Sequence, residues 1–126
     1  MGTPESRVKL LESEVEVVKA YFSGLSDEEL QTPSTCAGWT VADVVGHLAG
    51  QDHAPRVRRG LLGDYSPPEG SPPVADHDED RFSKNIFDRA LATRDQFGED
   101  LVAYFHQRVD ETVEVFKSVT PEDWDN

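Results

Sequence analysis

Apolar residues near the start of the chain recur at intervals of three and four. This spacing places them on one face of a helix, which we predict over residues 4–23. Thr3 is the expected N-cap, Pro4 suits the first helical turn, and Gly24 can end the helix. The apolar face consists of Val8, Leu11, Val15, Val18 and Phe22.

A second helix is predicted to begin within the stretch CAGWTVADVVGHLAG. Thr40 followed by Asp43 has the spacing of a capping box, in which each side chain bonds the backbone N–H of the other residue. Trp39, just before the cap, can pack on Val44 as a hydrophobic staple. We expect the buried stripe of this helix to consist of Val41, Val44, Val45 and Leu48.

The rest of the chain predicts two more helices and no strand, because no segment alternates apolar and polar residues. Pro55 should kink or break the second helix. Residues 63–80 are rich in proline, glycine and acids, which predicts an irregular surface loop, long enough to act as a lid or binding rim. A short helix is expected around Phe82, Ile86 and Ala90, and a long one over about 94–119. The predicted fold is a single all-α domain over residues 1–126, most simply an up-and-down antiparallel bundle.

A six-residue pattern occurs three times, at residues 25–30, 39–44 and 119–124. Each copy reads as an apolar residue, a Ser or Thr cap, two spacers, an acid and another apolar residue. The third copy therefore predicts a further helix, yet the sequence stops at Asn126. We expect a bundle that apparently lacks its last helix and leaves one apolar face uncovered. A second copy of the chain could cover that face in a homodimer.

Composition narrows the range of partners. The 126 residues contain 12 Lys and Arg against 25 Asp and Glu, a formal net charge of -13. So much negative charge argues against nucleic acid and anionic membranes, and it leaves small molecules, cations or basic proteins. With one cysteine, no internal disulfide can form, which suits a reducing cytoplasm. We also expect neither a secretory signal nor a membrane span, because no apolar run is long enough.

His47 is the strongest candidate for chemistry. It lies about 100° from the centre of the predicted stripe, so it is a boundary residue. It could be an ordinary half-buried histidine or a metal ligand facing a cavity near the helices at 4–23 and 94–119. Asp52 would fall near the middle of the stripe, where an unpaired carboxylate is costly. Either the helix bends before it, or Asp52 points into a polar cavity.

Three other candidates have simpler interpretations. His106 and Asp110 are spaced to share a metal, but they lie on the polar side of their helix, which favours a solvated surface pair. Cys36 could form a nucleophile–base pair with His47, although a small packed cysteine is the more common case. The basic cluster could bind a carboxylate or pair with the acidic loop that follows. It consists of Arg56, Arg58 and Arg59.

The second predicted helix resembles a known signature, C-x-G-W-T-V-x-D-V-x-x-H-L. This signature is typical of the mycothiol-dependent maleylpyruvate isomerase N-terminal domain, within the DinB-like group of helical metal proteins. The resemblance extends more loosely over nearly the whole chain, including the proline-rich loop and residues 120–124. The matching residues are Cys36, Gly38, Trp39, Thr40, Val41, Asp43, Val44, His47 and Leu48.

The resemblance implies a divalent metal, commonly zinc, bound by His47 and by an E-x-x-x-H or H-x-x-x-H pair on a last helix. In the named enzyme the metal helps mycothiol, a thiol cofactor, to isomerise a cis-alkene diacid. The present sequence has no such pair. Two hypotheses follow: the domain of a metal-dependent isomerase or thiol transferase, acting on a small thiol or carboxylate, or a non-catalytic acidic bundle that binds a partner or itself.

Overall fold

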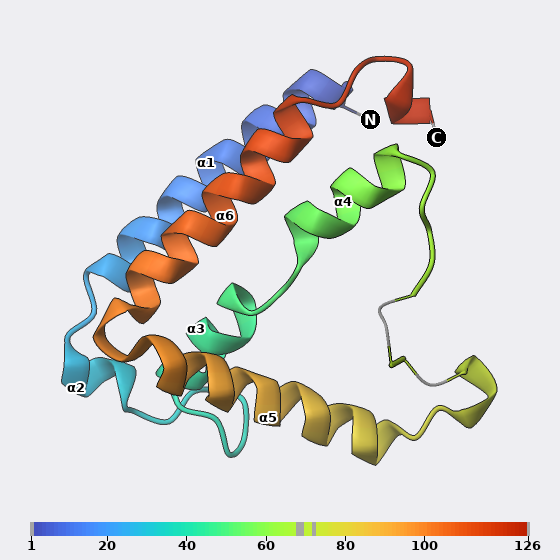
Figure 1. Cartoon of the computed structure of the whole chain (residues 1–126). Helices are drawn as coiled ribbons and strands as arrows, with labels where there is room; N and C mark the ends of the chain where they lie inside the picture. The colour runs from blue at the N-terminus through green and yellow to red at the C-terminus, as the bar shows by residue number, and fades with distance from the viewer. Residues whose placement is uncertain (1, 68–69, 72, 126) are drawn as a thin grey trace.

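The computed structural model describes residues 2–67, 70–71 and 73–125, and this part of the chain is helical (Figure 1). An isolated bridge between Pro33 and Thr40 is the sole β-type pairing among these residues. The all-α prediction is therefore confirmed, and the arrangement is consistent with a DinB-like helical bundle.

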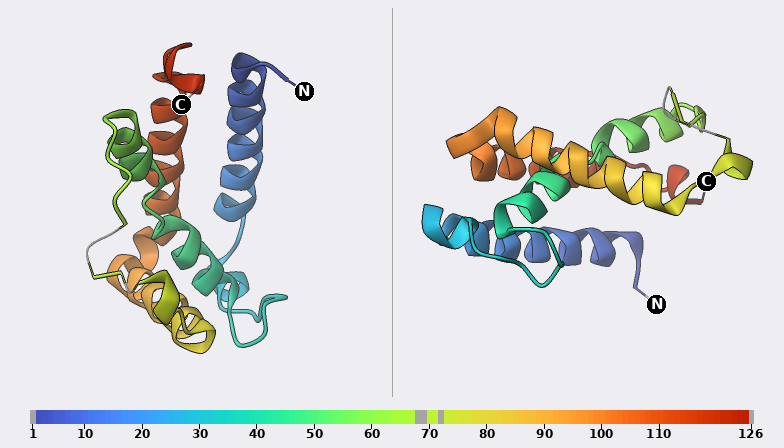
Figure 2. Two further views of the ribbon diagram at one scale, coloured as in Figure 1. Left: turned by 90° about the vertical axis from the view of Figure 1, so that its right-hand side faces the viewer. Right: turned by 90° about the horizontal axis from the view of Figure 1, so that it is seen from below.

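Three long helices and three short ones make up the fold. The long helices are α1 (Pro4–Ser23), α5 (Glu79–Phe97) and α6 (Leu101–Lys117). The short ones are α2 (Asp27–Leu30), α3 (Val41–Ala49) and α4 (His53–Leu61). Single 3-10 turns occupy Val74–Asp76, Gly98–Asp100 and Asp123–Asp125. Helices α1 and α6 run antiparallel side by side, and α4 packs alongside α6 (Figure 1). Helix α5 crosses the lower end of this layer at a steep angle (Figures 1 and 2).

The helix starts follow the capping predictions. The first helix begins and ends as predicted, and the N–H of Ser6 donates to Thr3 Oγ1 at 3.1 Å. At α3, the N–H of Asp43 donates to Thr40 Oγ1 at 3.2 Å, and the N–H of Thr40 donates to the Asp43 carboxylate at 2.9 Å. Ser26 caps α2 in the same reciprocal way. Local hydrogen bonds therefore account for where these helices begin.

The predicted boundary between the last two helices is wrong. The expected short helix is the 19-residue α5, and the expected long helix begins at Leu101 rather than near residue 94. The chain turns at Gly98, whose φ of +50° favours glycine. Phe97, which fits the apolar stripe of either helix, ends α5 and stacks on Tyr104 with 3.7 Å between ring centroids.

The predicted buried stripe of α3 is also wrong in part. Val45 is fully buried, but Leu48 is 40% exposed. The other apolar residues that α3 buries are smaller than leucine: Ala42, Gly46 and Ala49. A Cβ added at Gly46 would lie 2.5 Å from the Ala90 carbonyl oxygen, so α5 packs directly on the α3 backbone. Close approach of the two helices thus selects small side chains over large ones. The core cluster comprises Phe22, Ala42, Val45, Ala49, Leu101 and Phe105.

The predicted interruptions are confirmed. Helix α3 ends at Ala49 and α4 begins at His53, so the chain breaks just before Pro55. Residues 63–80 are largely irregular, apart from one 3-10 turn and the start of α5; residues 68, 69 and 72 lie outside the described part. After α6, Thr120 caps a 3-10 turn, and Trp124 stacks on Phe116 at 6.2 Å between ring centroids.

Candidate functional site

The break between α3 and α4 is held by two arginines from distant parts of the chain. The last carbonyls of a helix lack partners within it and need other donors. Arg108 of α6 donates to the carbonyls of Ala49, at 3.1 Å, and of Gln51. Arg89 of α5 donates to the carbonyl of Gly50 at 2.7 Å. Three successive carbonyls, from Ala49 to Gln51, therefore each have a guanidinium partner.

The same arginines hold Asp52. Its carboxylate oxygens lie 2.8 Å from the Arg89 guanidinium and 2.9 Å from that of Arg108. Partial burial acts to raise the pKa of Asp52, but the hydrogen bonds and charges of Arg89 and Arg108 outweigh it and lower the pKa below its usual value. Of the two alternatives for Asp52, the structure shows the bend, with the carboxylate in an ion-pair network.

His47 lies two residues before the end of α3 and is half-buried. Its Nδ1 lies 3.2 Å from the Gln51 side-chain amide, which also donates to the His47 carbonyl at 3.3 Å. The Trp39 ring meets the imidazole nearly at right angles, with 5.6 Å between centroids. Trp39 also contacts Phe87 of α5 at 5.2 Å, so the residue before the cap joins α3 to α5. These contacts limit the rotation of the imidazole.

His47 lines a cavity of about 430 Å3, as expected for a residue that does not face open solvent. The location of that cavity differs from the prediction: α3, α4 and α5 form it, rather than α1 and α6. The reason is that α5 packs across α3, which directs this side of α3 away from α1. The lining residues are Gly46, His47, Leu48, Gln51, His53, Arg56, Phe82, Ile86, Arg89 and Ala90.

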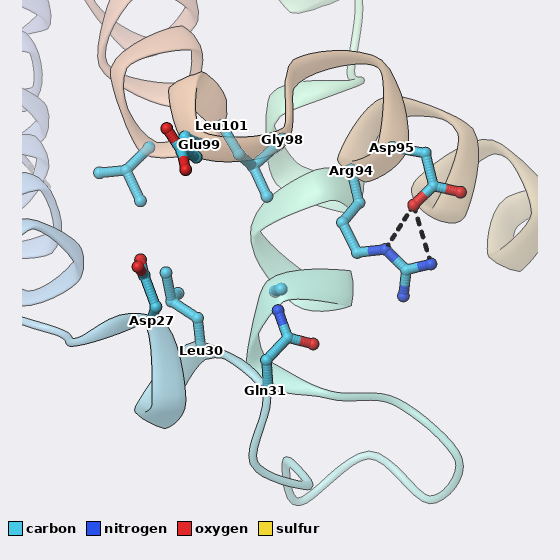
Figure 3. A pocket seen from close by; sticks show the side chains of 10 residues that line it. Asp27, Leu30, Gln31, Arg94, Asp95, Gly98, Glu99 and Leu101 are labelled. Carbon is cyan, nitrogen blue, oxygen red and sulfur yellow. Dashed lines mark hydrogen bonds and ion pairs between the residues drawn. The ribbon is translucent and has the colours of Figure 1, made fainter.

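A larger cavity, of about 570 Å3, lies on the other side of α3, and its described lining includes no histidine or cysteine (Figure 3). Carboxylates of Asp27 and Glu99 lie on opposite sides of its mouth (Figure 3). Beside it, Arg94 of α5 bonds both the exposed Asp95 and the buried Asp43. This ion pair fastens the first turn of α3 to α5.

Two of the other candidate groups differ from expectation. Asp110 is exposed, as predicted, but His106 is half-buried, and both side chains contact α1. His106 Nε2 lies 3.0 Å from Ser23 Oγ, and Asp110 accepts from Lys19 Nζ at 2.9 Å. Cys36 is exposed rather than packed. The prediction assumed that the polar side of α6 faces solvent, but the side of α6 that faces α1 also includes polar residues.

Within the basic cluster, the alternative of pairing with the loop is confirmed for Arg59. Arg59 donates to the Ser66 carbonyl at 3.1 Å and lies 3.8 Å from the Asp64 carboxylate, so it pairs with the loop that follows. Arg56 instead lines the cavity beside His47.

Comparison with known proteins decides the family. The family model of the mycothiol maleylpyruvate isomerase N-terminal domain matches residues 11–126. The chain belongs to this family. The matched range includes the capped start of α3 and His47.

One curated relative is similar to part of this chain. A protein of Geobacillus thermodenitrificans, named "Putative metal-dependent hydrolase", is 35% identical over 78 residues. The match covers 60% of this chain and 40% of that protein. No solved structure matches this member of the family significantly. Within the described residues, no helix is both long and apolar enough to cross a membrane.

The described residues of this chain do not assemble the metal-ligand set that the maleylpyruvate isomerase family implies. In the part of the chain that the structure describes, no three His, Cys, Asp or Glu side chains gather to hold a metal ion. Sequence reasoning missed His53, Arg89 and Arg108 at this site. Nothing in local spacing marks them, since the two arginines reach the break from 37 to 59 residues away.

Proposed function

We propose that this chain is a metal-binding domain in which His47 supplies one ligand to a divalent metal, with zinc as the metal and mycothiol as the thiol cofactor. The observation that carries the proposal is the setting of His47: a half-buried imidazole of the family signature, restrained at one nitrogen and lining a cavity. The metal-dependent relative supports the same function. The reaction class we propose is isomerisation or thiol transfer.

The residues around His47 can fix the orientation of its ring, as residues that support a metal ligand do in other proteins. A metal-binding histidine usually has its second ring nitrogen hydrogen-bonded, which fixes the ring orientation. Gln51 occupies that position, and its amide can present nitrogen or oxygen to Nδ1 according to the tautomer. Arg89 and Arg108 fix the backbone on which Gln51 sits. A complete site needs further ligands, so we derive no metal-dependent step from the present residues.

Zinc titration of the purified chain tests this proposal. We expect binding no tighter than about micromolar, because affinity depends on ligand number and geometry and His47 is a lone ligand. His47→Ala should weaken binding further. His106→Ala is the matched control, because it removes an imidazole that contacts α1 and lies away from the cavity. Equal zinc affinity of the wild type and His47→Ala would refute the ligand role. Tight binding lost in His47→Ala would show that a neighbour such as His53 completes the site.

A second candidate function is self-association of an acidic, non-catalytic bundle. A strongly apolar groove of about 330 Å3 runs between α1 and α6 beside the end of α3. We propose that a second copy of the chain covers it in a homodimer. The apolar residues that line it are Leu11, Val15, Val18, Leu48, Phe105 and Val109.

Light scattering over protein and salt concentration tests the dimer. The net charge of -13 opposes association, so dimerisation should strengthen as salt screens the repulsion. A monomer at tens of micromolar, at both low and high salt, would contradict the proposal.

We also propose a reducing cytoplasmic location, which suits the exposed thiol of Cys36.

A further inference from the structure

The cavity beside His47 differs in charge from the rest of this protein. The chain carries 25 acidic residues, yet none of the described residues that line this cavity is Asp or Glu. The larger cavity, by contrast, is lined by Asp27, Asp95 and Glu99. A cavity lined by arginines, with no carboxylate in its described lining, presents a local environment suited to an anion.

Two arginines line the cavity, but they are not equivalent. Arg89 is already paired with the Asp52 carboxylate at 2.8 Å and donates to the Gly50 carbonyl. The Arg56 guanidinium makes no hydrogen bond or ion pair with any other residue of the described ranges, and the residue is exposed where it lines the cavity. One positive charge is therefore left for a ligand. Gln51 and the imidazoles offer further polar atoms nearby.

The remainder of the lining is apolar. Ile86 and Ala90 come from α5, and the large side chains of Leu48 and Phe82 are 40% and 50% exposed at the cavity. A volume of about 430 Å3 is within the range of small-molecule sites. Apolar surface left open to water in such a concave site gains free energy when an apolar ligand covers it.

We infer that this cavity binds a small organic anion with one negative charge and an apolar body, anchored at Arg56. The charged group pairs with the guanidinium, and the body covers Leu48 and Phe82. This inference deepens the proposed function, on which it rests for the role of the cavity as a substrate site. It names the substrate class: a monoanion such as a medium-chain carboxylate, rather than a dianion or a neutral compound.

NMR titration of the full chain with hexanoate, in the presence of a metal chelator, tests the inference. Amide shifts should centre on Gly46 and Ala90 at the cavity. Arg56→Gln should weaken hexanoate binding about tenfold, since charge-assisted hydrogen bonds to carboxylates are the strong ones. Arg58→Gln is the matched control: it removes the same charge from the same helix at a position outside the cavity lining. This variant should bind hexanoate within about twofold of the wild type. Arg56→Lys keeps the charge and should retain part of the affinity.

Comparison of ligands tests the single charge. Hexanamide should bind more weakly than hexanoate, and the dianion adipate no more tightly. The inference is overturned by equal binding of hexanamide, by tighter binding of adipate, by equal losses in the Arg56 and Arg58 variants, or by shifts centred on the larger cavity. Because the titration excludes metal, its failure leaves the zinc result intact, and a failed zinc titration leaves hexanoate binding intact.

Discussion

Replacing Asp43 by Ala should destabilise the fold more than replacing Asp52 or Asp95. Asp43 is 3% exposed, the sole charged residue among the buried residues described. Its carboxylate accepts from the N–H of Thr40 and pairs with Arg94 across 51 residues of sequence. The substitution removes the start signal of α3 and its attachment to α5 together, and it leaves Arg94 beside an apolar gap.

The magnitude follows from the burial of the two partners. Removing one member of a fully buried ion pair costs about 3–5 kcal/mol, mainly because the other charge is left uncompensated. Arg94 is 29% exposed and keeps Asp95 at 3.0 Å, so water and Asp95 offset part of that cost. We therefore expect a loss of about 3 kcal/mol. A domain with a total stability of about 5–15 kcal/mol would still fold.

Urea unfolding followed by circular dichroism measures this loss. Asp95→Ala is the control, because Asp95 binds the same guanidinium but is 70% exposed. Exposed ion pairs contribute little, so the control should lie within about 0.5 kcal/mol of the wild type. If the two variants lost equal stability, or if Asp43→Ala lost less than about 1 kcal/mol, the attachment of α3 through the buried pair would be refuted.

Three further outcomes are expected from unfolding measurements. Gly46→Ala should destabilise by about 1–3 kcal/mol, because its Cβ meets the Ala90 carbonyl at 2.5 Å; Gly60→Ala, with only ordinary contacts, should stabilise by about 0.5–1 kcal/mol. The lowered pKa of Asp52 means that its contribution is present above about pH 4, the unfolded value, and is lost as pH falls through the folded pKa. The stability difference between wild type and Asp52→Asn should therefore shrink in acid. Thr40→Ala should cost about 1 kcal/mol, and an unchanged midpoint would count against the cap.

The parts of the fold that depend on neighbours in sequence could be predicted from the sequence. Thr3, Ser26 and Thr40 cap helices because each reaches a backbone N–H three residues away. The break before Pro55 follows from the missing N–H of proline. His47 could be recognised as a boundary residue because its angle on the helix depends on helical geometry alone.

The parts that depend on tertiary packing could not. Leu48 looks like a core residue by hydrophobicity, but α5 approaches the α3 backbone at Gly46 too closely for large neighbours. Phe97 suits the apolar pattern of both α5 and α6, so the pattern alone predicts a continuous helix across Gly98, where the chain in fact turns. Arg108 carries no local signal at all for its contacts with the break.

The arginine-held break has a consequence for the order in which the chain folds. The capping bonds span three residues and can form in an otherwise unfolded chain, whereas Arg108 reaches the Ala49 carbonyl across 59 residues. The break can take its final shape only after α5 and α6 have docked, since contacts of large sequence separation form late unless they belong to the nucleus. Contacts made after the rate-limiting step slow unfolding and leave refolding unaffected. In stopped-flow experiments, Arg108→Met should therefore accelerate unfolding with little change in the refolding rate, and the geometry around His47 would be the last part of the molecule to form and the first to be lost.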